Sequence, residues 1–232
     1  MSNSTLVDLT ILSPNNSGKR KQPISRITVH CTACMVTAKR LGEIFLPRSR
    51  NASCNYGIGT DLKIVLVVDE SMRSWCSSSN DNDQKSVTIE AASYGVKPYE
   101  FAPGVYDKTV DLCVDICQRN GKKKVVYIPD KTTALKYKPA DDEMLLTFHR
   151  WFSNTKSCPG DWFMARAKEF ADTINKRLNP APDPEMFYII KKGDRFDKIA
   201  KAHGLTRNQL KALNPGIVDI NKIYPGQMLR IK

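Results

Sequence analysis

Short hydrophobic runs in the first part of the chain predict strands. Residues 26–30 and 87–91 have the length and apolar character of buried strands. Residues 56–59 and 64–68 have the spacing of a hairpin. We therefore expect a β-sheet in this part of the protein.

Longer segments with a helical period lie between these runs. Residues 37–45, 106–120 and 161–178 each place apolar side chains on one face of a predicted helix. Residues 144–149 lead into a loop, and residues 1–22 have the composition of a loop that wraps the domain. The alternation of strands and helices predicts an α/β domain, with a mixed central sheet flanked by helices.

A proline-rich segment divides the chain. Three prolines between Asn179 and Glu185 are incompatible with a helix or a paired strand, so we expect a stiff, extended linker at residues 180–185. The α/β domain then covers residues 1–179. Residues 186–232 form a small second domain, whose pattern predicts the order strand, helix, helix, strand.

The composition is that of a globular protein. Hydrophobic residues make up 41% of the chain, and no run approaches the roughly 18 apolar residues of a membrane-spanning helix. The first eight residues lack the basic segment and apolar stretch of a signal peptide. We therefore expect synthesis in the cytoplasm without a signal peptide, and release by another route if the protein acts outside the cell.

The charge favours a polyanionic partner. The net charge is +12, and residues 186–232 alone hold ten Lys and Arg against three Asp and Glu. Nucleic acid is one such partner, and a bacterial wall that carries anionic polymers is another. Charge alone does not distinguish them.

Histidine and cysteine supply the candidate metal ligands. Seven cysteines form an odd, irregular set, which favours reduced thiols over a disulfide framework. Two histidines flank the domain's core pattern: His30 ends a predicted strand, and His149 precedes a loop that contains Cys158. Two imidazoles and a thiolate match a catalytic zinc site, which keeps one position open for water. Their spacing alone favours ordinary buried core residues over a metal site.

Four segments carry a family resemblance. They are residues 27–33 (ITVHCTA), 53–58 (SCNYGI), 79–90 (SNDNDQKSVTIE) and 148–161, which contains FHR and KSCPGD. In this order they resemble the zinc-dependent N-acetylmuramoyl-L-alanine amidases, a family that includes phage lysozyme-type amidases and peptidoglycan recognition proteins. The resemblance covers residues 26–178 and implies that one Zn²⁺ ion is bound by His30, His149 and Cys158.

The same resemblance implies three catalytic residues. Tyr56 and Lys156 fall where the family has a tyrosine and a lysine near the metal, and such donors stabilise an oxyanion. Glu90 falls on a strand where some relatives place a glutamate that accepts the proton of water. The alternatives are a core aromatic for Tyr56, a solvated loop lysine for Lys156, and a carboxylate that only orients a neighbouring group for Glu90.

Two residues depart from the family pattern, and three further cysteines are expected in the core. Cys76 replaces a histidine and Trp151 an acidic residue that are often found in the family, which affects substrate contacts and the orientation of the ligands. Cys31 alternates away from the neighbouring histidine on its strand, so we expect it in the core. Cys113 and Cys117 lie four residues apart on a helix and are expected in the core too.

The second domain resembles a LysM domain over residues 187–232. The segments that carry the resemblance are 188–194, 199–204, 210–215 and 223–231. LysM domains bind glycans that contain N-acetylglucosamine, in a groove between two loops. Carried over, the glycan-binding residues are Gly193, Asp194, Arg195, Phe196, Asn214, Pro215, Ile223 and Tyr224, whereas His203 is expected to be structural.

Three functions follow as hypotheses. The first is a peptidoglycan hydrolase that cleaves the amide between N-acetylmuramic acid and L-alanine, acts as a monomer, and resembles the endolysin of a phage or prophage. The second is a non-catalytic peptidoglycan-recognition protein on the same scaffold. The third is a nucleic-acid-binding protein, which the charge allows but no motif supports.

Overall fold

The computed structural model describes residues 2–180 and 184–232. The chain divides into two compact units, Met1–Pro180 and Ala181–Lys232. The predicted linker at residues 180–185 lies partly outside the described residues. We find no described helix with the length and hydropathy that a membrane crossing requires.

The first unit is built on a mixed sheet. Within the described residues, seven strands lie in the order β1-β5-β4-β7-β3-β9-β8. The five strands from β4 to β8 run parallel, and β5 and β1 run in the opposite direction. The strands are β1 Leu9–Thr10, β5 Ile64–Leu66, β4 Tyr56–Ile58, β7 Ser86–Ala91, β3 Arg26–Cys31, β9 Glu143–Phe148 and β8 Lys124–Val126. A separate antiparallel pair joins β2 Asn16–Lys19 to β6 Met72–Ser74.

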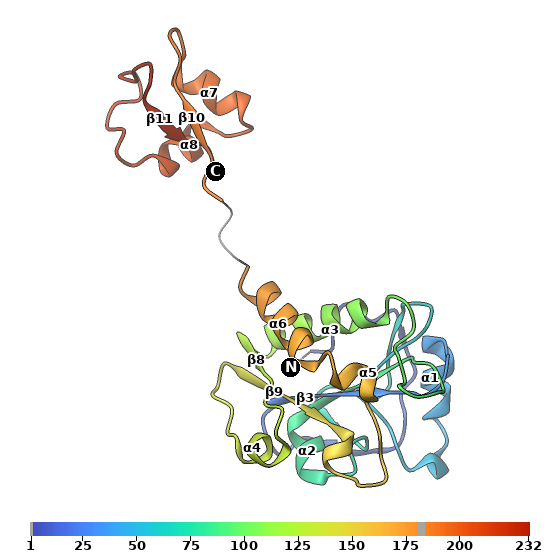
Figure 1. Cartoon of the computed structure of the whole chain (residues 1–232). Helices are drawn as coiled ribbons and strands as arrows, with labels where there is room; N and C mark the ends of the chain where they lie inside the picture. The colour runs from blue at the N-terminus through green and yellow to red at the C-terminus, as the bar shows by residue number, and fades with distance from the viewer. Residues whose placement is uncertain (1, 181–183) are drawn as a thin grey trace. The chain divides into compact units, whose positions relative to one another are not determined.

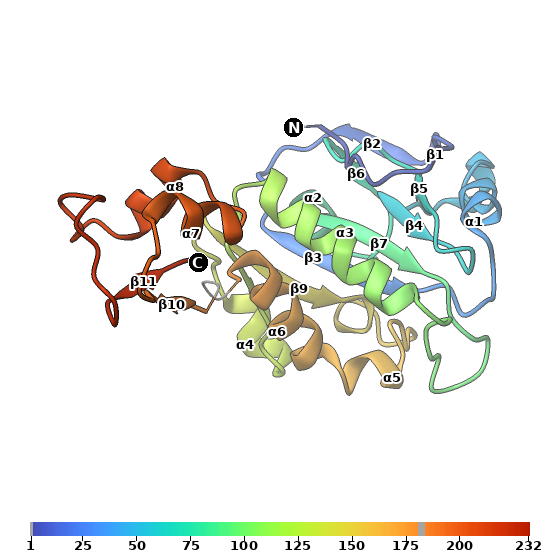
Figure 2. The same cartoon turned by 90° about the horizontal axis from the view of Figure 1, so that it is seen from above.

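Helices cover both faces of this sheet (Figures 1 and 2). The helices α3 (Val105–Arg119) and α6 (Ala167–Leu178) pack together on one face, where Cys113 and Cys117 are fully buried as predicted. The opposite face carries α1 (Ala38–Ile44) and α2 (Asn80–Lys85). The shorter elements are η1 Arg48–Arg50, α4 Lys131–Lys136, η2 His149–Trp151 and α5 Asp161–Met164.

This architecture confirms the predicted α/β fold with a mixed sheet between helices. The predicted hairpin is present, because β4 and β5 pair antiparallel. The prediction of a loop at residues 1–22 was wrong in part, because β1 and β2 lie there. Both strands are too short and too polar to stand out as a periodic pattern.

The predicted helix at residues 161–178 is interrupted between α5 and α6. The Arg166 amide bonds to the Phe163 carbonyl, three residues earlier, and not to the Trp162 carbonyl. The Arg166 guanidinium lies over the Trp162 ring and donates to the Trp162 carbonyl at 3.0 Å. The side chain thus satisfies the carbonyl that the break leaves without its helical donor.

The second unit has the predicted order of strand, helix, helix and strand. β10 (Phe187–Ile189) and β11 (Met228–Arg230) pair antiparallel, and α7 (Phe196–Ala202) and α8 (Arg207–Leu213) lie between them in sequence. Thr206 and Gln209 form the reciprocal capping box that the sequence predicts for α8. A small core that contains Phe196, Leu210 and Leu229 holds the unit together.

Candidate metal centre

The parallel strands bring the chemistry-bearing residues to one edge of the sheet. His30 lies near the end of β3 and is directly opposite Glu90 of β7. The neighbouring strand β9 ends at Phe148, so that His149 begins the next turn. Because carboxyl ends of parallel strands meet at the same edge, three residues that are distant in sequence become neighbours.

The structure brings together His30, His149 and Cys158. Their ligand atoms all lie within 4.8 Å of one another, and the two imidazole rings are 5.0 Å apart. His30 is fully buried, and neither of its ring nitrogens has a hydrogen-bond partner among the described residues. A buried polar group without a partner is costly, so these nitrogens suit a bound cation. Imidazole and thiolate are the donors that zinc prefers.

The loop that carries Cys158 is fixed by hydrogen bonds from both sides. The Cys31 amide donates to Cys158 Sγ at 3.2 Å, and the Arg150 guanidinium donates to the Ser157 carbonyl. Gly160 has a φ of +91°, and a Cβ there would lie 2.7 Å from the Pro98 carbonyl oxygen. The glycine of the Cys-Pro-Gly segment is therefore required for the close approach that seats the loop.

Cys31 does not follow its prediction as a simple core residue. It is half-buried, packs against the core, and also lines the cavity beside Cys158. The prediction assumed that side chains alternate along a strand. Cys31 is the last residue of β3, where this alternation ends.

Burial shifts the pKa of each candidate ligand in the direction that favours the neutral form of its side chain. Desolvation lowers the pKa of His30 well below its usual value, and lowers the pKa of His149 to about 4, with help from the charge of Lys156. Desolvation also raises the pKa of the Cys158 thiol well above its usual value. At pH 7 the metal-free centre therefore holds two neutral imidazoles and one protonated thiol.

We expect zinc binding at pH 7 to release about two protons from the protein, one from Cys158 and one from Glu90, whose carboxyl has a pKa of about 8 before the cation arrives. The imidazoles release none, because they are already neutral. The association constant should rise with pH while these two groups remain protonated, and should fall more steeply below pH 4, where His149 is protonated. Calorimetric titration in buffers of different ionisation enthalpy measures the proton count; release of less than one proton near pH 7 would contradict this assignment.

A cavity of about 360 Å³ opens beside this centre. Its apolar wall includes Leu41 and Phe45, and its polar lining includes Lys156 and Arg50. Lys156 is exposed, and both cations lie close enough to Glu90 to lower the pKa of its carboxyl. The cavity thus places a lysine ammonium beside the candidate ligands His149 and Cys158.

Glu90 lines the same cavity. Its Oε2 atom is buried and has no hydrogen-bond partner among the described residues, and Oε1 lies 3.9 Å from Cys76 Sγ. Burial raises the pKa of this carboxyl to about 8, although Arg50 and Lys156 act in the opposite direction. Glu90 can accept a proton at neutral pH only when a further positive charge lowers this pKa.

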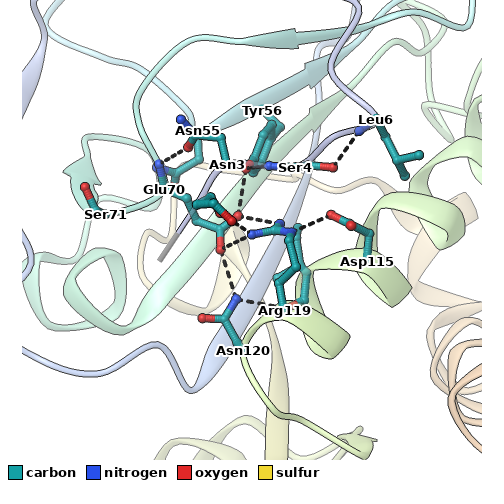
Figure 3. A network of polar contacts seen from close by, with 12 residues as sticks. Asn3, Ser4, Leu6, Asn55, Tyr56, Glu70, Ser71, Asp115, Arg119 and Asn120 are labelled. Carbon is teal, nitrogen blue, oxygen red and sulfur yellow. Dashed lines mark hydrogen bonds and ion pairs between the residues drawn. The ribbon is translucent and has the colours of Figure 1, made fainter.

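The structure contradicts the prediction for Tyr56. Its side chain points to the sheet face opposite His30, because Tyr56 pairs with Ile89 in the register and His30 pairs with Glu90. The Tyr56 hydroxyl donates to Glu70 at 2.7 Å in a buried network (Figure 3). Tyr56 is not among the described residues that line the cavity. The core alternative was the correct one.

This network has a structural role. Glu70 accepts hydrogen bonds from Tyr56, Arg119 and Asn120, and the Ser4 amide donates to the Tyr56 hydroxyl at 3.0 Å (Figure 3). It ties the N-terminal segment, the loop after β5 and the end of α3 together. A buried carboxylate is stable there because each oxygen has a charged or polar donor.

We expect Tyr56→Phe to lower the free energy of unfolding by about 1–3 kcal/mol, because Glu70 loses one donor and the Ser4 amide loses its acceptor. Zinc affinity should be unchanged. Urea unfolding and a zinc titration of the same variant measure both quantities. A large loss of zinc affinity with normal stability would contradict this structural role and indicate that Tyr56 acts at the metal centre.

The predicted glycan-binding residues of the second unit have different surroundings. Tyr224 and Arg195 are exposed, whereas Ile223 is half-buried against the core. The Phe196 side chain is 3% exposed within the core, so only its backbone is available to a glycan. Asn214 exchanges hydrogen bonds with the Arg230 backbone. The other predicted residues, Gly193, Asp194 and Pro215, lie in loops.

Two families of known proteins match this chain. The model for N-acetylmuramoyl-L-alanine amidases matches residues 20–161, and the model for LysM domains matches residues 188–232. The first match covers more than half of the chain. The chain therefore belongs to the N-acetylmuramoyl-L-alanine amidase family and carries a LysM domain, as its motifs predicted.

Individual relatives match over shorter stretches. The teichoic acids export ATP-binding protein TagH of Enterococcus faecalis is 49% identical over 45 residues, which are 19% of this chain and 10% of that protein. The endolysin of Bacillus phage B103 is 39% identical over 62 residues, which are 25% of this chain and 24% of the endolysin. The chain thus spans a quarter or less of these curated relatives.

One solved structure supports the fold. The Staphylococcus aureus hydrolase AmiA superposes with a TM-score of 0.52 at 12% identity, over 74% of this chain and 83% of that chain. At this identity the likeness shows the α/β fold alone.

The structure adds residues that the sequence did not single out for the site. Arg50, Ser78 and Cys54 are the clearest: Arg50 lines the cavity, the Ser78 hydroxyl lies 2.9 Å from His149 Nε2, and Cys54 is buried close to Glu90. None belongs to a periodic pattern or to a spacing typical of ligands. Only the folding of loops over the sheet edge brings them to the centre.

Proposed function

We propose that this protein hydrolyses the amide between N-acetylmuramic acid and L-alanine in peptidoglycan, with one zinc ion bound by His30, His149 and Cys158. One observation carries the proposal: three zinc-type donors from three separate segments converge within 4.8 Å beside a cavity. The buried, unpartnered nitrogens of His30 fit such an ion. Membership of the amidase family supplies the reaction class.

The residues around the cavity have separate roles in the proposed reaction. A zinc ion held by this donor set supplies Lewis acidity and lowers the pKa of water to about 7. Lys156 places an ammonium at the cavity, where it stabilises the negative charge that develops on the amide oxygen. Glu90 accepts the proton of the attacking water and passes it to the leaving amine, once nearby positive charge keeps its carboxyl ionised.

The cavity also accounts for the class of substrate. Its mixed lining of apolar and cationic side chains suits a muramoyl peptide, whose sugar and alanine methyl are partly apolar and whose stem peptide carries carboxylates. Arg50 is placed to receive one of these carboxylates. The LysM domain binds the glycan, so the enzyme acts at the bacterial wall, as a monomer in the manner of a phage or prophage endolysin.

Ending the chain after Pro180 should weaken action on intact cell walls and spare the chemistry. We expect the rate at low wall concentration to fall roughly tenfold to a hundredfold, because the LysM domain no longer raises the local concentration of enzyme. Hydrolysis of a soluble muramoyl peptide should be unchanged. Dye release from labelled walls and chromatography of the soluble product compare the two; equal losses on both substrates would contradict a targeting role.

Mass spectrometry of digested peptidoglycan tests the proposed function. We expect new free amino groups on L-alanine. New reducing sugars would indicate a glycosidase, and other new amino termini an endopeptidase. Bound zinc without any release would favour the recognition protein over the enzyme.

A further inference from the structure

We infer a second binding position for a thiophilic divalent cation, formed by Cys76, Glu90 and His30. The ligand atoms of these three residues lie within 4.8 Å of one another. This group differs from that of His30, His149 and Cys158 in two of its three residues, and the two groups share His30. The chemistry is that of zinc or cobalt(II): an imidazole nitrogen, a thiol sulfur and a carboxylate oxygen.

The donor atoms of this group lack better partners. Both ring nitrogens of His30 and the Oε2 atom of Glu90 are buried without a hydrogen-bond partner among the described residues. Cys76 is also buried, and its sulfur meets Glu90 Oε1 only at 3.9 Å, which is long for a hydrogen bond. A neutral imidazole offers one unprotonated nitrogen, so His30 serves one cation at a time and the two positions compete for it.

The backbone around these residues is held in place. The Asp83 carboxylate accepts hydrogen bonds from the amides of Cys76 and Ser77, at 3.0 and 3.1 Å. Glu90 is fixed by the sheet, where β7 pairs with β3 and with β4. These contacts organise the group before the cation arrives. Metal ligands that need little rearrangement lose less entropy on binding.

A cation at this position would have a consequence for activity, which rests on the proposed function. Zinc in excess over one equivalent would be held by Cys76 and Glu90, and would compete with the first ion for His30. Because it occupies the Glu90 carboxylate, the excess should inhibit hydrolysis, and Cys76→Ser should relieve that inhibition. The replacement changes one atom, so the shape of the cavity floor is kept.

Cobalt(II) reports the position directly, because a cobalt–thiolate bond gives a charge-transfer absorption that imidazole and carboxylate ligands do not. In Cys158→Ala, the first group has lost its thiol. We expect this variant to retain a cobalt–thiolate band, and the additional replacement Cys76→Ser to abolish it. Glu90→Gln in the Cys158→Ala background should keep the band but raise the dissociation constant on the order of tenfold.

Cys34→Ser in the Cys158→Ala background is the matched control, since Cys34 lines the same cavity but belongs to neither ligand group. It should retain the band. Thermal unfolding of each variant shows that it is folded. A band that is absent from Cys158→Ala, or that survives Cys76→Ser, overturns the second position. A full-length protein without any cobalt–thiolate band would instead contradict the proposed zinc site itself.

Discussion

Replacing Cys158 by alanine is expected to lower kcat/KM for release of L-alanine from peptidoglycan by about a thousandfold or more. The replacement leaves two imidazoles and removes the thiolate that completes the three-donor set. Loss of the Lewis acid from this position removes several kcal/mol of transition-state stabilisation, which corresponds to a change of this size. Zinc content after dialysis measures the loss of bound metal, and a chromatographic assay of the product measures the loss of activity.

Cys34→Ala is the matched control for this experiment. Cys34 is an exposed cysteine that lines the same cavity but belongs to no candidate ligand group. It should retain zinc and activity. If Cys158→Ala hydrolyses its substrate at the rate of the unmodified protein, Cys158 has no part in the catalytic centre.

Replacing Lys156 by alanine should lower kcat by about 10²–10³ and leave zinc content unchanged. The ammonium at the cavity opposes charge that exists mainly in the transition state, so KM should change much less than kcat. Steady-state kinetics on a soluble muramoyl peptide separate the two parameters.

Lys131→Ala removes the same charge from the exposed start of α4, which is not part of the described cavity lining. It controls for the effect of net charge on a polyanionic wall and should leave both parameters unchanged. A loss confined to KM in Lys156→Ala would make Lys156 a substrate-binding residue and exclude the proposed role in stabilising the oxyanion.

The sequence predicted most of the scaffold, because its signals are local. The strand at residues 26–30, the hairpin and the capping box at Thr206 each rest on a periodic pattern or a short motif, and the structure contains all three. The helix break at Arg166 was missed, because it depends on a guanidinium that packs over Trp162.

The site was predicted less completely, because its residues meet only through the fold. His30, His149 and Cys158 were identified through resemblance to a family, since their spacing alone favours core residues. Tyr56 was misassigned because a one-residue shift along a strand moves a side chain to the opposite face. The sequence marked Cys76 only as a departure from the family pattern, and the structure places it beside Glu90.

X-ray absorption at the zinc edge of the purified full-length protein tests the central claim most directly. We expect about one zinc per chain with one sulfur ligand at roughly 2.3 Å and two imidazole nitrogens at roughly 2.0–2.1 Å. The sulfur contribution should disappear when Cys158 and Cys76 are both replaced, because each candidate ligand group then lacks its thiol. A zinc ion with no sulfur ligand in the unmodified protein would contradict the account.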